Sequence, residues 1–128
     1  MTAVRAFVAS ALALLMATAC DPGQPEPDRG RYYWGAEVRV VCPCGAAPVE
    51  PDGHALCFWT RTDPETQARL KSFVQRHSDS PYQGFYLVYR GQLLDEAPVG
   101  FGASYDGLMR IDEIVELSAA VPADCQAP

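Results

Sequence analysis

Four residues in the middle of the chain have the types and spacing of a metal site. Cys42, Cys44, His54 and Cys57 follow the pattern C-x-C-x9-H-x2-C. Three thiolates and one imidazole would hold Zn²⁺ tetrahedrally, and the soft sulfur ligands would also suit Cu(I). Periplasmic handling of copper or zinc is therefore one function that these residues predict.

The same cysteines allow a second interpretation, in which they form disulfides. With Cys20 set aside, Cys125 brings their number to four. An even number of cysteines in an exported chain of this size is typical of a disulfide framework, and four cysteines allow three connectivities. A metal site would leave Cys125 unpaired, and an oxidising compartment favours disulfides. We therefore predict two disulfides and no bound metal or cofactor, with the connectivity open.

Catalytic motifs are absent from the sequence. There is no H-E-x-x-H and no G-x-S-x-G. A disulfide within Cys42-Pro43-Cys44 would be strained and reducible, but no C-x-x-C stands at a helix N-terminus to lower a thiol pKa. These observations predict a binding or sensing protein rather than an enzyme.

The first 19 residues predict a secretory signal. Arg5 supplies the positive end, and the 14 residues of 6–19 are apolar or small. This run is shorter than the roughly 20 residues that a membrane helix needs. Ala17-Thr18-Ala19 fits a cleavage site, and Cys20 follows it as in the bacterial lipobox. An ordinary secretory signal is the alternative. We expect lipid on Cys20 to anchor the protein to the inner or outer membrane, facing the periplasm.

The charge of the mature chain argues against some partners. After residue 19, nine basic residues stand against sixteen acidic ones, which leaves a net charge of −7. Such a surface repels phosphate backbones and does not favour a polybasic membrane contact. We therefore expect no nucleic-acid partner, and an envelope protein remains a possible partner.

The hydrophobic pattern after the signal predicts a single, mainly β domain. The ranges 36–41, 55–60, 85–90, 99–105 and 108–117 suit strands, with turns at Asp52-Gly53 and Asp106-Gly107. Residues 63–77 suit one amphipathic helix, capped by Asp63, with Leu70, Phe73, Val74 and His77 on one face. A small five-stranded OB-like barrel with one helix fits this count. An OB barrel has its helix after the third strand, whereas the pattern puts it after the second. Either a strand is missing or the topology differs.

The composition sets the expected domain boundaries. Residues 20–31 are rich in proline, glycine and charge, so they predict a tether with polyproline character. The domain is expected to span residues 32–125, and residues 126–128 form a tail. The cluster Tyr32-Tyr33-Trp34 predicts packing at the core or rim, with ligand stacking as the sharper alternative.

Short motifs along residues 32–125 resemble the C-terminal OB-like domain of NlpE-type envelope lipoproteins. They are Gly35-Ala36-Glu37-Val38, Cys44-Gly45, Phe58-Trp59, the helix residues Leu70, Phe73 and Val74, Pro81, Tyr86-Leu87-Val88, Gly91 and Asp124-Cys125. The resemblance implies a bridge between Cys44 and Cys125, which leaves Cys42 and Cys57 as an additional pair. It also implies a link to sensing of envelope stress. The family's N-terminal lipocalin-like domain has no counterpart between the signal and residue 32.

Overall fold

The structure is a computed structural model that describes residues 26–45, 56–81 and 83–126. No helix in these ranges is long and apolar enough to cross a membrane. The elements are the strands and helices β1 (Asp28–Gly35), β2 (Val38–Pro43), β3 (Phe58–Thr62), α1 (Pro64–His77), β4 (Phe85–Leu94), the 3-10 helix η1 (Gly100–Ser104), β5 (Leu108–Ser118) and the 3-10 helix η2 (Ala123–Cys125).

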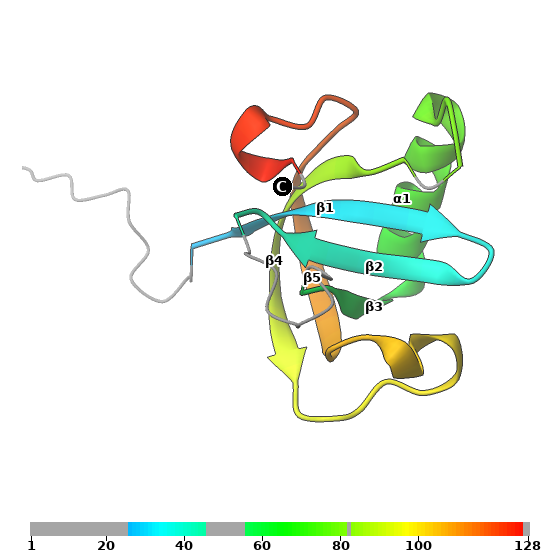
Figure 1. Cartoon of the computed structure of the whole chain (residues 1–128), viewed down its shortest axis with the longest axis vertical. Coiled ribbons are helices and arrows are strands. Elements are labelled where there is room, and N and C mark those ends of the chain that lie inside the picture. Colours follow the sequence, from blue (N-terminus) through cyan, green and yellow to red (C-terminus); the bar gives the residue numbers. More distant parts are fainter. Residues whose placement is uncertain (1–25, 46–55, 82, 127–128) are drawn as a thin grey trace, which may run out of the picture.

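The five strands close into a barrel in the order β1-β2-β3-β5-β4. Neighbouring strands are antiparallel except for β3 and β5, which run parallel with Thr60 opposite Met109. Helix α1 follows the third strand, as expected of an OB barrel, and lies behind β1 and β2 in Figure 1. The prediction of a small, mainly β, five-stranded OB-like barrel with one amphipathic helix is confirmed.

Strand β1 is the element that the sequence pattern did not reveal. The tether was predicted to extend to Arg31, but β1 begins at Asp28. Arg31 lies opposite Cys42 of β2 and Tyr86 of β4. Charged side chains obscure the pattern here because they alternate with Gly30 and Tyr32, and Tyr32 is the residue that faces the core. This strand accounts for the position of α1 after the third strand.

Residues 99–105 form η1 and its flanks, so the prediction of a strand there is wrong. Gly100 has a φ of +63°, which interrupts extended backbone. The predicted hairpin at Asp106-Gly107 is not formed either. Instead, the amide of Asp106 donates to the carbonyl of Cys57 at 3.1 Å, and the amide of Trp59 donates to the carbonyl of Gly107 at 2.9 Å. The segment is thereby attached to the start of β3.

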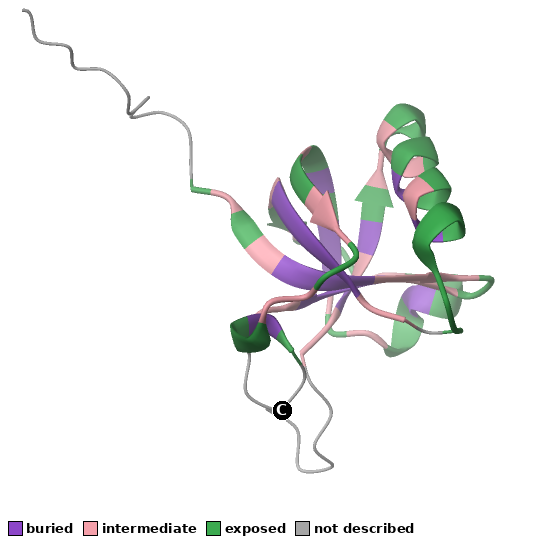
Figure 2. Cartoon of the chain, turned by 90° about the horizontal axis from the view of Figure 1, so that it is seen from above, coloured by how far each residue is buried: buried purple, intermediate pink, exposed green. Residues whose placement is uncertain are grey.

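Helix α1 forms as predicted, within one residue. The carboxylate of Asp63 accepts from the amide of Thr66 at 2.8 Å, which satisfies an orphan donor of the first turn. This hydrogen bond also lowers the pKa of Asp63. Leu70 and Val74 are buried against the barrel, whereas His77 is exposed and stacks on Phe73. Figure 2 shows the buried stripe on the barrel side of the helix and exposed residues on the other side.

The core has two parts because β4 is buried on both faces. Residues of one face fill the barrel, and the inner cluster contains Tyr32, Val41, Phe58, Leu70, Val74, Phe85, Leu87, Tyr89, Met109 and Ile111. Tyr86 and Val88 point to the other face, where they pack with Cys125 and the half-buried Cys44 and Val121. The C-terminal segment therefore covers the outside of β4 and explains why this strand is apolar at successive positions.

Candidate functional site

The four cysteines after residue 40 are joined in two disulfides. One joins Cys42 to Cys57, with Cα atoms 4.1 Å apart, and the other joins Cys44 to Cys125, with Cα atoms 4.2 Å apart. These are the two pairs that the resemblance to NlpE-type domains implies. Both bridges start at the end of β2, and one reaches the beginning of β3 while the other reaches η2.

These bridges bear directly on the alternative metal site. Cys42, Cys44 and Cys57 would all have to be thiolates to bind Zn²⁺ or Cu(I). Each is instead part of a disulfide, so reduction of both bridges would have to precede metal binding. Within the described ranges, no group of three or more metal-ligating side chains gathers. His54 and Cys20 lie outside the described residues.

A cluster of polar contacts accompanies the bridge to Cys125. The guanidinium of Arg29 donates to both carboxylate oxygens of Asp124, at 2.9 and 3.0 Å, and to the hydroxyl of Tyr86 at 2.6 Å. The hydrogen bonds from Arg29 lower the pKa of Asp124. Because Asp124 precedes Cys125 and Arg29 belongs to β1, the pair and the disulfide hold the same segment against the barrel.

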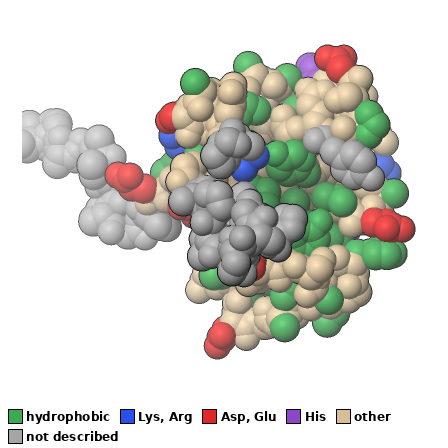
Figure 3. All heavy atoms as spheres, viewed as in Figure 1, with side chains coloured by type: hydrophobic (Ala, Val, Ile, Leu, Met, Phe, Trp, Pro, Cys, Tyr) green, Lys and Arg blue, Asp and Glu red, His purple; other side chains and the backbone are tan. Residues whose placement is uncertain are grey.

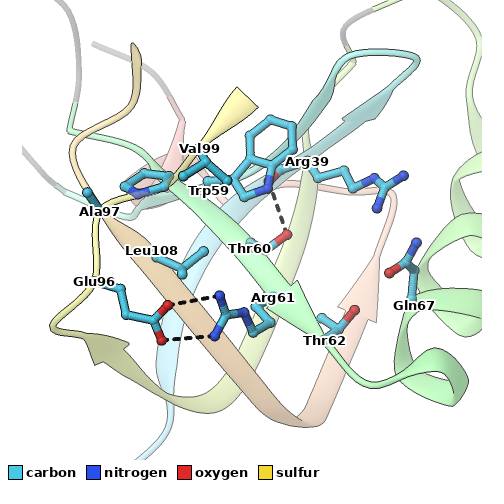
Figure 4. A pocket seen from close by; sticks show the side chains of 11 residues that line it. Arg39, Trp59, Thr60, Arg61, Thr62, Gln67, Glu96, Ala97, Val99 and Leu108 are labelled. Carbon is cyan, nitrogen blue, oxygen red and sulfur yellow. Dashed lines mark hydrogen bonds and ion pairs between the residues drawn. The ribbon is translucent and has the colours of Figure 1, made fainter. Parts of the chain in front are cut away.

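A groove of about 270 Å³ lies over β3, between the β4–β5 connection and α1. Figure 4 shows its side chains along both sides of the strand. The groove is lined mainly by polar and aromatic groups, with some apolar residues of the connection: Arg39, Trp59, Thr60, Arg61, Thr62, Gln67, Glu96, Ala97, Pro98, Val99 and Leu108. OB barrels bind their ligands on the surface of strands 2 and 3, beside the loops between strands 1 and 2 and strands 4 and 5. The groove occupies the part of this surface that β3 and the β4–β5 connection form, with Arg39 contributed by the second strand.

The groove is open because β2 and β3 pair over a short length. Among the described residues, Val40 pairs with Trp59 and Val41 pairs with Phe58, and the ladder between the two strands stops there although each strand continues. Next along, the hydroxyl of Thr60 donates to the carbonyl of Arg39 at 3.0 Å. A side chain thus satisfies the backbone of β2 at this point, and Arg39 projects beside the helix (Figure 4).

The two arginines of the groove have different surroundings. Arg61 donates two hydrogen bonds of 3.1 Å to Glu96, which lowers the pKa of that carboxyl group. Arg39 lies on the opposite side of β3 in Figure 4, toward Gln67. Its guanidinium carbon lies 5.0 Å from the ring centre of Trp34, and no acidic partner occurs for it within the described part of the chain. The charge of Arg61 is neutralised locally, whereas that of Arg39 is not.

Trp59 is the aromatic centre of this surface. Its ring centre lies 5.8 Å from that of Tyr105, and a Cβ placed on Gly102 would come within 2.7 Å of the indole. One part of the ring therefore packs against η1, and the half-buried remainder lines the groove. Beyond it, the connection leaves Val99 and Phe101 exposed, at 82% and 64% of their surface.

The sequence did not single out this groove. Of the clustered aromatic residues, Tyr32 is buried in the core and Trp34 packs against it, which supports the core interpretation. Trp59 and Arg39 were placed on strands without a role. An arginine within a run of valines and a tryptophan at the start of Trp59-Thr60-Arg61-Thr62 were the available signals, but only the barrel brings them to the two sides of one groove.

Comparison of the chain with models of protein families, with curated proteins and with solved structures finds no match. The likeness to NlpE-type domains therefore remains an inference from short motifs. The geometry of the groove and the signal-like sequence of residues 1–19 are the remaining guides to function.

Proposed function

We propose that the protein is a lipid-anchored lipoprotein of a bacterial cell envelope, with an OB-like domain that binds a ligand and performs no catalysis. The groove over β3 is the observation that carries this proposal. It lies on the surface where OB barrels bind ligands, and it combines a partly exposed indole with hydroxyl, amide and guanidinium groups. Binding sites typically combine such an apolar surface with a few placed polar groups.

The leader and the disulfides support an envelope location. A signal-like segment, Cys20 at the expected lipidation position and a proline-rich segment precede the barrel. Two disulfides suit an oxidising compartment outside the cytoplasm. The resemblance to NlpE-type domains adds a link to envelope stress, in which ligand binding at the groove would be the sensed event.

A pair of crosslinking variants tests the binding surface. A photo-crosslinking amino acid is placed at Val99, beside the groove, or at Val115 of β5, which is exposed but does not line the groove. We expect irradiation of living cells to give a defined adduct from position 99 and none from position 115. Adducts at neither position, or equal adducts at both, would contradict a specific binding surface at the groove.

Replacement of Cys20 tests the anchor. The variant Cys20→Ser cannot receive lipid at the sulfur, and within the described ranges no helix is able to span a membrane. We expect this variant to move from the membrane fraction to the soluble periplasmic fraction, while Cys42→Ser, as a cysteine control, stays with the membrane. Retention of Cys20→Ser in the membrane fraction would refute the lipid anchor.

A further inference from the structure

The groove contains a positive charge that no carboxylate of the described residues neutralises. Arg29, Arg61, Arg90 and Arg110 each form an ion pair with a carboxylate. Arg39 has no such pair within the described ranges, although the mature chain carries a net charge of −7. In a protein with an excess of acidic groups, an arginine without a carboxylate at a hollow surface is available to an acidic ligand.

We propose that the groove binds an acidic oligosaccharide, with a carboxylate of the sugar on Arg39 and a sugar ring against Trp59. This inference rests on the proposed binding function and names its ligand class. A planar guanidinium recognises a carboxylate through two parallel hydrogen bonds. The guanidinium of Arg39 stacks on Trp34, with its carbon 5.0 Å from the ring centre. This contact orients the guanidinium in the absence of ligand.

The rest of the lining suits a sugar better than a peptide. The hydroxyl group of Thr62 and the amide of Gln67 offer donors and acceptors beside Arg39, whereas the buried hydroxyl of Thr60 already donates to the carbonyl of Arg39. Trp59 offers a flat apolar surface of the kind on which the C–H face of a pyranose ring packs. A peptide anchored by an apolar side chain would need a deep apolar pocket, whereas this groove is open and largely polar.

The charge distribution argues against a nucleic acid. Every nucleotide brings a phosphate, and strand-binding grooves meet this series of charges with a positive surface. In this groove Arg61 is neutralised by Glu96, so among the lining residues that the structure describes Arg39 is the one unneutralised cation. An oligosaccharide with one carboxylate per two sugars has a lower charge density than a nucleic-acid strand, and for any acidic sugar the proposal needs only one carboxylate to pair with the guanidinium of Arg39.

The test compares an acidic sugar with its uncharged counterpart. The full-length mature lipoprotein in detergent micelles is titrated calorimetrically with tetragalacturonic acid and with its methyl ester. We expect the acid to bind more tightly. Arg39→Gln should weaken binding of the acid roughly tenfold or more, since a hydrogen-bonded charge pair is lost, and should leave binding of the ester unchanged. Trp59→Leu should weaken binding of both sugars.

Controls separate the site from general charge effects. Arg110→Gln removes the same charge on β5, outside the groove, and should alter neither affinity. Arg39→Lys keeps the positive charge but not the two parallel donors of a guanidinium, so it should bind the acid with intermediate affinity. Such residual binding would also show that the site is folded. Hexaglutamate and an octamer of deoxythymidylate should bind more weakly than the sugar acid.

The possible results distinguish the ligand class from the binding function. Equal affinity for acid and ester, or tighter binding of the peptide or the oligonucleotide, would overturn the acidic-sugar proposal. Absence of sugar binding together with a crosslink at position 99 would overturn it too, while the groove remained a binding surface. Absence of both would overturn the binding function itself.

Discussion

At the scale of single residues, arginines of this protein form two kinds of contact. Arg29 and Arg61 donate to carboxylates in bidentate pairs, which fix the C-terminal segment and the β4–β5 connection. Arg31 and Arg39 lie near the rings of Tyr33 and Trp34, at 5.9 and 5.0 Å from the ring centres. The first kind supports the fold, and the second leaves the charge of Arg39 available at the groove.

The pair between Arg29 and Asp124 predicts a pH dependence of stability. The pKa of Asp124 is lowered in the folded protein, so its contribution is present above the unfolded pKa of about 3.9. It is lost as the pH falls through the lower, folded pKa. We therefore expect Asp124→Asn to lower the Tm modestly at pH 6–7, and the difference between variant and wild type to be smaller at pH 3 and to vanish below the folded pKa of Asp124.

Asp79→Asn is the matched control, because Asp79 is exposed and no ion pair of its carboxylate occurs within the described ranges. It should leave the Tm unchanged at both pH values. Both members of the Arg29–Asp124 pair are partly exposed, so 1 M salt should reduce the effect of Asp124→Asn. A Tm difference that persisted undiminished at pH 3 would show that the carboxylate acts through something other than its charge.

At the scale of elements, the close approach of the paired strands β4 and β5 depends on Gly91. The register shifts between Arg90 and Gly91, and a Cβ on Gly91 would collide with the carbonyl oxygen of Arg110. We expect Gly91→Ala to reduce the free energy of unfolding by about 2–3 kcal/mol in urea denaturation, because backbone atoms of β5 must move.

Gly35→Ala provides the comparison at the end of β1. The nearest atom to a Cβ there is that of Val38, at 3.8 Å, which is an ordinary contact. The change should therefore alter the free energy of unfolding by about 1 kcal/mol at most. Equal free energies of unfolding for the two variants would indicate that β4 and β5 can move apart at Gly91 without loss of stability.

At the scale of the whole molecule, the bridge between Cys44 and Cys125 joins residues 81 apart in sequence. Such a link restricts the unfolded chain and stabilises the fold by about 4 kcal/mol in the chain-entropy model. We expect Cys125→Ser to lower the Tm by more than about 10 °C, measured by circular dichroism. Figure 1 shows what the bridge secures, since the C-terminal turn lies against the barrel beside β1 and β4.

The shorter bridge supplies the control for this prediction. Cys42 and Cys57 are 15 residues apart, so the same model gives their bridge about 3 kcal/mol. Loss of the shorter bridge should therefore lower the Tm less than loss of the longer one. An unchanged melting curve of Cys125→Ser would show that the bridge has no structural role.

The face formed by β1 and β2 carries both apolar and acidic side chains. Hydrophobic side chains gather over the middle of the face formed by β1 and β2, and acidic side chains lie nearer its edge (Figure 3). The formal net charge of −6 is consistent with this acidic margin. Only the folded arrangement shows that Arg39 has no carboxylate partner among the residues that the structure describes.

Local features were predictable because they depend on neighbouring residues. Asp63 and Pro64 determine where α1 starts, and the spacing of Leu70 and Val74 determines which face it buries. The two strands Val38–Pro43 and Phe85–Leu94 were found, in part, by their β-branched and aromatic residues.

Features that depend on distant contacts were not predictable in the same way. Strand β1 is polar at alternate positions and is held by ladders to β2 and β4, so its local composition resembled a tether. Residues 99–105 have strand-like side chains, but their backbone is fixed by packing of Gly102 on Trp59. The sequence alone determined the class of fold, the helix and the set of cysteines. The tertiary structure decided the cysteine pairs, the first strand and the groove, because each of these requires residues that are far apart in sequence to come together.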